Sequence, residues 1–341
     1  MSLKHLRGKI LTALALGLVI MVVMGLVSDM REVGATFGSF RWTTLPAILG
    51  LTVLNYVLRW LKWDYYLRRL RLGHGVNAGD SGLLFTAGMV MAVTPGKVGE
   101  VFKSYLLRRI NGTPVSVSAP IVLAERLTDG LGMLLLMALG LTLYPPARPG
   151  FVAMVVLSGL GIAVLQSRPL FERLLGWLEQ LPLGSKVAPK AKAIYTSTRQ
   201  LLEWRVLLIS TLLSVVSWGF ECIAFYYVLT GLQVEGTWLL LLQATFIFAA
   251  STLFGLVSFL PGGLGTSEIT SVGLLMVLVG TDSSVATTAT ILIRFCTLWF
   301  GVSLGIVALA WFGRRYRGDE RVEPVGVALP TPDSQSPTSD S

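Results

Sequence analysis

The chain has 341 residues, of which 53% are hydrophobic and only 14% are charged, and its mean hydropathy is +0.69. Soluble domains carry about 25% charged residues, so this composition excludes an ordinary soluble domain and indicates an integral membrane protein. The formal net charge is +9, but the basic residues gather in alternate loops, as membrane topology requires, so we expect no nucleic-acid partner.

Apolar stretches along the chain predict an all-α, polytopic fold. A helix needs roughly 20 mostly apolar residues to cross a bilayer, and six stretches approach or exceed that length. The first follows Lys4, Arg7 and Lys9 as a signal peptide would, but no small-x-small cleavage site precedes Asp29, so we interpret it as a retained anchor. The six stretches are residues 10–27, 44–61, 115–143, 151–166, 206–229 and 285–312.

The distribution of Lys and Arg predicts which loops face the cytoplasm. The loops that we assign to the outside, after residues 28, 144, 231 and 281, hold only Arg31, Arg41 and Arg148 of the 28 Lys and Arg residues. The opposite loops and the two ends hold 20, among them Lys62. The positive-inside rule therefore places both termini in the cytoplasm.

Two polar segments lie outside the apolar stretches. Residues 167–205 combine apolar residues at helical spacing with a Lys-rich stretch, which predicts an amphipathic segment on the cytoplasmic surface, against anionic lipid. Residues 318–341 are rich in Pro, Ser, Thr and Asp, which is typical of a disordered tail. We therefore expect one transmembrane domain, residues 1–317, followed by a cytoplasmic tail.

The chain offers little for conventional catalysis. Cys222 and Cys296 both lie in apolar spans, so no disulfide framework or cysteine metal site is indicated. His5 and His74 are the only histidines and lie near cytoplasmic ends, which argues against histidine-based catalysis. No nucleotide-binding loop occurs either. We expect no metal and no cofactor, and a transporter rather than an enzyme.

A repeated Pro-Gly motif interrupts the two remaining apolar blocks. The first copy reads T-P-G-K-V-G-E and ends at Glu100, and the second reads L-P-G-G-L-G-T-S-E and ends at Glu268. Each glutamate precedes an arginine by 26 residues, Arg126 in the first copy and Arg294 in the second. This shared spacing predicts an internal repeat. The helix-breaking residues are Pro95, Gly96 and Gly99 in the first copy and Pro261, Gly262, Gly263 and Gly265 in the second.

The loops that flank the two blocks predict two re-entrant helical hairpins of opposite orientation. Residues 83–107 lie between basic loops, whereas residues 238–280 lie between loops without basic residues. Inverted repeats whose broken helices meet near the midplane are found in many secondary transporters. Broken helices are tolerated at membrane depth only where they are buried in protein or line a wet cavity, so we expect such a cavity.

Ionisable residues around the two breaks form the candidate functional site. A charged side chain in a span costs at least about 2.5 kcal/mol unless it is paired or hydrated, so Arg126 and Arg294 need partners. Glu100 and Glu268 are candidates by repeat symmetry. One alternative is that these glutamates only cap their half-helices, and another is that the ions form a fixed structural network. The other candidates are Lys97, Lys103, Glu125, Asp129 and Glu221.

The first break also carries basic residues that the second lacks. Lys97 lies within it, at the position that Gly263 occupies in the second copy, and Lys103 follows Glu100 by three residues. An anionic lipid head group that enters from the cytoplasm would meet these two charges first. Either side chain has the alternative of reaching out to the membrane interface, and this applies to Lys103 in particular.

Three motifs resemble the lysylphosphatidylglycerol synthase transmembrane family, also described as flippase-like or UPF0104 proteins. They are T-P-G-K-V-G-E-V-F-K-S-Y-L-L from Thr94, E-R-L-T-D-G from Glu125 and F-L-P-G-G-L-G-T-S-E from Phe259, and with the helix pattern the resemblance covers roughly residues 8–315. The resemblance implies a bacterial or archaeal cytoplasmic-membrane protein that handles a lipid-like molecule. Some members with a fused synthase domain are thought to translocate aminoacylated phospholipids, and the absence of such a domain here leaves the lipid open.

These observations lead to three functional hypotheses. The first is a lipid translocase of flippase type, in which a phospholipid or lipid-linked head group passes between the hairpins. The second is an intramembrane transferase that uses Glu100, Asp129 or Glu268 as a general base on a lipid. The third is a scaffold that holds a separate lipid or glycolipid synthase through the basic segment 168–205.

Overall fold

The computed structural model describes residues 30–94, 99–180, 195 and 198–316. Within these ranges every regular element is a helix and there is no strand. Six helices there are long and apolar enough to cross a membrane, which confirms the predicted all-α, polytopic class. The expected anchor at 10–27, the tail at 318–341 and, within the segment 167–205, residues 181–194, 196 and 197 lie outside the described residues.

The helices follow the predicted apolar stretches closely. Three of them begin at a side chain that caps the first turn: Asn77 before α4, Thr237 before α11 and Asp282 before α13. The elements are α2 (Met30–Gly38), η1 (Trp42–Thr44), α3 (Leu45–Arg69), α4 (Ala78–Gly88), η2 (Met89–Val93), α5 (Phe102–Asn111), α6 (Val115–Leu139), η4 (Pro145–Ala147), α7 (Arg148–Gln166), α8 (Arg168–Glu179), α10 (Trp204–Gly231), α11 (Trp238–Val257), η5 (Pro261–Gly263), α12 (Thr266–Leu274), η6 (Leu275–Val279), α13 (Ser283–Arg294), η7 (Phe295–Trp299) and α14 (Phe300–Arg315). The elements η6 and η7 are π-helical.

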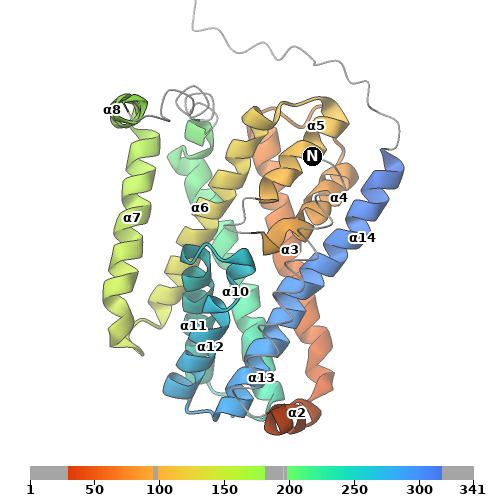
Figure 1. The fold of residues 1–341 in the computed structure, drawn as a ribbon, viewed down its shortest axis with the longest axis vertical. Helices are drawn as coiled ribbons and strands as arrows, with labels where there is room; N and C mark the ends of the chain where they lie inside the picture. Colours follow the sequence, from red (N-terminus) through yellow and green to blue (C-terminus); the bar gives the residue numbers. More distant parts are fainter. Residues whose placement is uncertain (1–29, 95–98, 181–194, 196–197, 317–341) are drawn as a thin grey trace, which may run out of the picture.

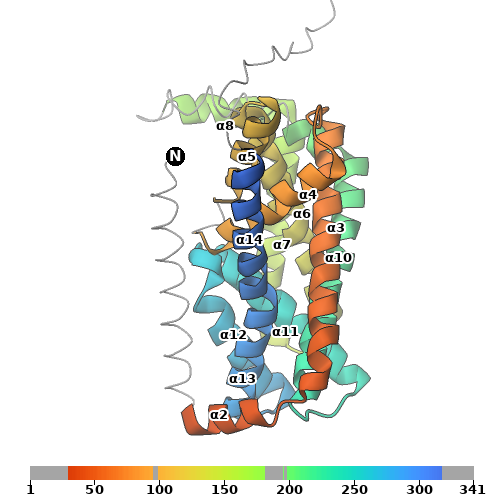
Figure 2. The same cartoon turned by 90° about the vertical axis from the view of Figure 1, so that its right-hand side faces the viewer.

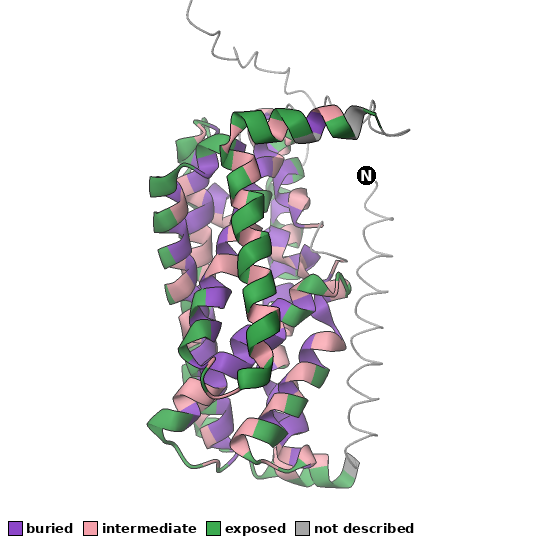
Figure 3. Ribbon diagram, turned by 90° about the vertical axis from the view of Figure 1, so that its left-hand side faces the viewer, coloured by how far each residue is buried: buried purple, intermediate pink, exposed green. Residues whose placement is uncertain are grey.

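Helix α10 is the centre of the bundle. It packs against α3, α6, α11 and α13, and the largest apolar core lies around it. Helix α7 stands at one edge with no buried residue (Figure 1), and Figure 3 shows exposed residues along its length. Since α7 is apolar throughout, its exposed surface suits contact with lipid chains.

The two ends of the bundle differ in charge. At the end where α8 lies across the helices (Figures 1 and 2), Arg69 pairs with Glu203 and Arg315 with Asp80. At the opposite end, α2 and the starts of η1 and α7 carry Arg31, Arg41 and Arg148. The described loops rich in Lys and Arg therefore share the α8 end, as the sequence predicts. The assignment of this end to the cytoplasm stays a prediction.

Two broken segments turn back inside the bundle, from opposite ends (Figure 1). Helices α4 and α5 belong to the α8 end, where the Asn111 side chain donates to the carbonyl of Leu72 at 2.9 Å. Helices α11 and α12 belong to the other end, where the Gln243 side chain donates to the carbonyl of Leu278 at 2.6 Å. This is the arrangement expected of two re-entrant hairpins, whereas the inverted internal repeat stays a prediction.

The breaks meet in the interior and are built on glycine. A Cβ on Gly262 would lie 3.6 Å from the Cα of Val93, at the tip of the first hairpin. Gly263 has φ +68°, which favours glycine, and a Cβ on Gly255 would lie 2.0 Å from Ser267 Oγ. In the first break the backbone N–H of Gly99 donates to Thr94 Oγ1 at 2.9 Å. Pro95 and Gly96 lie outside the described residues.

Candidate functional site

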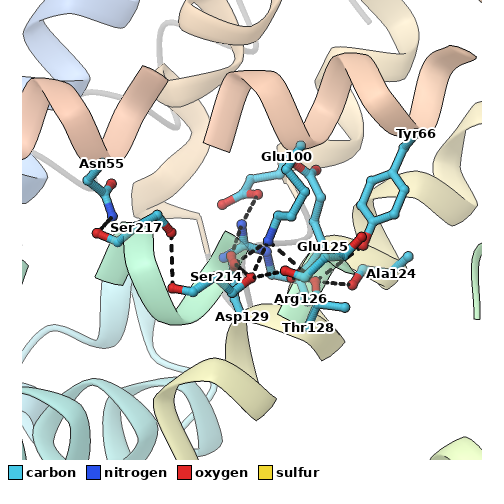
Figure 4. Close-up of polar contacts among 12 residues, drawn as sticks. Asn55, Tyr66, Glu100, Ala124, Glu125, Arg126, Thr128, Asp129, Ser214 and Ser217 are labelled. Carbon is cyan, nitrogen blue, oxygen red and sulfur yellow. Dashed lines mark hydrogen bonds and ion pairs between the residues drawn. The ribbon is translucent and has the colours of Figure 1, made fainter. Parts of the chain in front are cut away.

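A buried ionic cluster joins α3, α6 and α10 (Figure 4). The Lys62 ammonium pairs with Asp129, donates to Ser214 Oγ at 2.7 Å and lies 3.3 Å from Thr128 Oγ1. Ser214 Oγ in turn donates to Asp129 Oδ1 at 3.0 Å. Lys62 is only 1% exposed. Its three N–H donors therefore have three acceptors, which is the condition for keeping an ammonium in the interior.

The same cluster extends to the first hairpin through Arg126. Arg126 Nη2 lies 3.0 Å from Glu100 Oε2 and 3.2 Å from Asp129 Oδ2. The Nε atom of Arg126 is buried and makes no hydrogen bond to any described residue. Arg126 therefore connects the first break to Asp129 while retaining a donor that water or a ligand could use.

Lys103 forms a second contact between the first hairpin and α6. Its ammonium donates to Glu125 Oε2 at 2.5 Å and lies 4.6 Å from the ring centre of Trp63. Its aliphatic stem passes so close to α4 that a Cβ on Gly88 would lie 2.3 Å from Lys103 Cγ. The side chain is 3% exposed. Lys103 is thus packed inside the bundle and does not extend to the membrane interface.

The second hairpin has its own ion pair. Arg294 Nε donates to Glu268 Oε1 at 2.5 Å, and Arg294 Nη2 donates to the carbonyl of Gly262 at 2.8 Å. The other oxygen of Glu268 accepts the backbone N–H of Gly265 at 2.7 Å, which caps α12. Glu268 therefore does both things that the sequence left open: it caps its half-helix and it pairs with the arginine.

A cavity of about 120 Å³ lies where the two hairpins meet. Glu100 and Lys103 line it from the first hairpin, Gly262 and Ser267 from the second, and Arg294 from α13. A volume of this size admits several water molecules or a small polar group, and it is smaller than the roughly 300 Å³ of a typical ligand pocket. The remaining ionisable groups that line it are Tyr56 and Arg59 from α3 and Glu221 from α10.

Charges in and beside this cavity balance. Among the described residues the five basic side chains are Arg59, Lys62, Lys103, Arg126 and Arg294, and the five acidic ones are Glu100, Glu125, Asp129, Glu221 and Glu268. Their formal charges sum to zero when all are ionised. A region of zero net charge that is rich in ion pairs can accept a charged group by exchanging partners, at a lower cost than an apolar interior would impose.

Comparison with known proteins assigns the chain to a family. The family model for the lysylphosphatidylglycerol synthase TM region matches residues 11–305. The chain belongs to this family. It is also similar to UPF0104 membrane proteins of Methanothermobacter thermautotrophicus, with 26% identity over 342 residues (91% of this chain and 97% of the relative) and 25% over 310 residues (82% and 85%). The resemblance seen in the motifs is therefore confirmed, and the chain is a multi-pass membrane protein of a lipid-related family.

Family membership leaves the roles of individual residues as predictions, and the structure locates them. Both expected pairs, Glu100 with Arg126 and Glu268 with Arg294, are present. Asp129 contacts Arg126 as its spacing suggested, whereas Glu125 pairs with Lys103 instead. Lys97 lies outside the described residues.

Glu221 was a further candidate partner for the buried arginines, and its role stays a prediction. Glu221 is 1% exposed and lines the cavity, but no ion pair links it to Arg126 or Arg294 in the described part of the chain. Its hydrogen bond is a long one, from Thr52 Oγ1 at 3.5 Å.

The sequence analysis also placed Lys62 in a cytoplasmic loop, which is incorrect. Helix α3 continues to Arg69 because its polar side chains recur on one face, so the helix stays amphipathic after its apolar run ends. The polar stripe on this face comprises Thr52, Asn55, Arg59, Lys62 and Tyr66. These positions are separated by three and four residues alternately, and that spacing is the sequence signal that could have found Lys62 and Arg59.

Proposed function

We propose that this chain is a lipid translocase of flippase type, which moves a phospholipid or lipid-linked head group across the cytoplasmic membrane of a bacterium or archaeon. The observation that supports this most is the cavity lined by ionic residues from both hairpins and from α3, α10 and α13. Charged side chains at membrane depth are costly, and they commonly mark a substrate or ion pathway.

In this proposal the head group passes through the cavity while the acyl chains stay in the bilayer. A cavity of about 120 Å³ can hold a polar group but not a whole lipid. The apolar outer surfaces of the spanning helices would keep contact with the acyl chains. The substrate would therefore be divided between a polar interior and a lipid exterior, which is how a flippase avoids moving the chains through protein.

Exchange of ion pairs would couple the head group to movement of the hairpins. Arg294 bonds both Glu268 and the carbonyl of Gly262, so it holds the second break to α13. Arg126 similarly connects Glu100, next to the first break, with α6. An anionic group that draws either arginine away from its glutamate would release that break. Rocking of one hairpin against the other would then open the cavity to alternate faces of the membrane.

The orientation of the protein in the membrane and the partners at its α8 end follow from the uneven distribution of Lys and Arg between the loops. The α8 end would face the cytoplasm under the positive-inside rule, and we expect both termini on that side of the membrane. Helix α8 would lie against anionic lipid there, and the surface it forms could hold a separate lipid or glycolipid synthase. Such a partner would supply the substrate at the entrance of the cavity.

Purified protein in liposomes, assayed for movement of fluorescently labelled phospholipids between leaflets, tests the proposal. Arg126→Ala and Arg294→Ala are expected to abolish movement while the protein remains folded. Arg41→Ala, at the exposed opposite end, is the matched control and is expected to transport normally. Unchanged transport in both buried variants would remove these residues from the mechanism, and a chemically altered lipid would favour the intramembrane transferase instead.

A further inference from the structure

Glu221 is a buried carboxyl group that the ion pairs described above leave out. It lies in the middle of α10, one of the six spanning helices, and lines the cavity. No ion pair to it is present within the ranges that the structure describes, and the 3.5 Å contact from Thr52 is a weak hydrogen bond. An isolated ionised carboxylate at such a position is costly, and the carboxyl group avoids that cost by holding a proton.

Trp218 lies one turn before Glu221 on α10, and the Arg59 side chain of α3 stands over its ring. The Arg59 guanidinium stands 5.2 Å from the ring centre of Trp218 and makes no hydrogen bond or ion pair to any described residue. Trp218 is 9% exposed, and its Nε1 is likewise without a hydrogen-bond partner among the described residues. Both side chains line the cavity, so two sets of unused N–H donors lie next to a carboxyl group.

The other titratable groups near Glu221 do not supply its missing partner. Tyr56 of α3 donates its hydroxyl to the carbonyl of Thr297. Arg294 of α13 is already bonded to Glu268. Helix α11 contributes no titratable residue, and the ionic residues of α6 are paired with Lys62, Lys103 and Glu100. The two remaining groups in its surroundings are thiols, Cys222 on its own helix and Cys296 on η7.

We propose that Glu221 is a proton-binding site that couples lipid movement to the proton gradient, with Arg59 as its exchangeable counter-charge. This inference rests on the proposed translocase function. When an anionic oxygen of the head group binds Arg59 and the Trp218 N–H, Glu221 carries a proton taken from water on the same face. When the head group leaves, Arg59 turns to the Glu221 carboxylate and the proton is released to water on the face that is then open.

This exchange keeps the charge of the site constant through the cycle. The bound state holds a guanidinium, an anionic oxygen and a neutral carboxylic acid, and the empty state holds a guanidinium and a carboxylate. One proton and one anionic charge therefore move together, so no net charge is left in the interior at any step. Coupling to the proton gradient also supplies a driving force for lipid movement by a chain whose sequence contains no nucleotide-binding loop.

The transport test uses liposomes that contain trace labelled phosphatidylglycerol, with the membrane potential held at zero. With one proton per lipid, a gradient of about one pH unit shifts the leaflet distribution of the label about tenfold. We expect this shift for the wild type and no shift for Glu221→Gln. Glu203→Gln, the same exchange at an exposed carboxylate, is the control and is expected to keep the shift. A gradient-dependent shift that survives in Glu221→Gln overturns the inference.

A second measurement does not depend on transport. Infrared difference spectra of the purified wild type, recorded through a pH titration, should contain the C=O band of a buried carboxylic acid that Glu221→Gln lacks. If no lipid moves in any sample but this band is present, the translocase function fails and the proton site stands. If the wild type has no such band, or Glu221→Gln retains it, the proton site is excluded. Should Glu221→Gln not fold, a wild-type band whose frequency or titration midpoint shifts on Thr52→Val or Arg59→Gln assigns the proton to this site, and a band unchanged in both excludes it.

Discussion

Replacement of Lys62 by Met tests the ionic cluster that the sequence analysis missed. Met keeps most of the length of the side chain but removes the ammonium, so Asp129 loses its pair with Lys62 and Ser214 Oγ loses a donor. Breaking one partner of a buried ion pair costs about 3–5 kcal/mol. Asp129 keeps Arg126 at 3.2 Å and Ser214 Oγ at 3.0 Å, so we expect a loss near the lower limit, about 3 kcal/mol.

The assay is reversible unfolding in mixed detergent micelles, followed by tryptophan fluorescence. Arg68→Met on the same helix is the matched control, because its pair with Asp64 is exposed and worth less than about 1 kcal/mol. In the double variant Lys62→Met with Asp129→Asn, the losses should be smaller than the sum of the single losses. Single losses that simply add, to within about 0.5 kcal/mol, would refute the reasoning, because independent sites behave that way.

Two further predictions concern the second hairpin and its neighbour. Gly255→Ala should lower stability by about 1–3 kcal/mol, because its Cβ would meet Ser267 Oγ at 2.0 Å, whereas Gly273→Ala has nothing within 4 Å and should not; thermal unfolding distinguishes them. Asp282→Ala should cost about 0.5–2 kcal/mol by removing the cap of α13. The hydrogen bond from the Val285 N–H lowers the pKa of Asp282, so this contribution is present above the ordinary carboxyl pKa and is lost as the pH falls through the folded value. Unfolding curves of Asp282→Ala and the wild type should therefore converge in acid, and a constant difference would contradict the assignment.

Much of the fold could be predicted because long apolar runs in a sequence indicate membrane-spanning helices. The predicted stretch at 206–229 differs from α10 by two residues at each end, and the stretch at 285–312 corresponds to α13, η7 and α14. The pairing of Glu100 with Arg126 could be predicted because charges at membrane depth need partners and the equal spacing singled out both pairs.

The location of Lys62 was predicted wrongly, because hydropathy and loop charge assign a basic residue after an apolar run to a cytoplasmic loop. Lys62 follows the last apolar run of α3, so hydropathy assigns it to a loop, although its ammonium is held by Asp129 and Ser214. Asp129 shows why such partners escape a single-sequence analysis: its contact with Arg126 follows from their spacing on α6, whereas its contact with Lys62 of α3 depends on the tertiary packing. The same holds for Glu221: it forms no ion pair with Arg126 or Arg294 in the described part of the chain, and the packing of α10 against its neighbours decides this.

The central claim, that a lipid head group passes through the cavity between the hairpins, is tested most directly by filling the cavity. Ser251 lines it from α11, and Ser303 is exposed on α14. The two hydroxyls are alike in their bonding, because Ser251 donates to the carbonyl of Phe248 and Ser303 to that of Trp299. Lipid movement in liposomes should be lost in Ser251→Trp and retained in Ser303→Trp, with both proteins folded by size-exclusion chromatography. Folded Ser251→Trp that moves lipid at the wild-type rate would contradict the account.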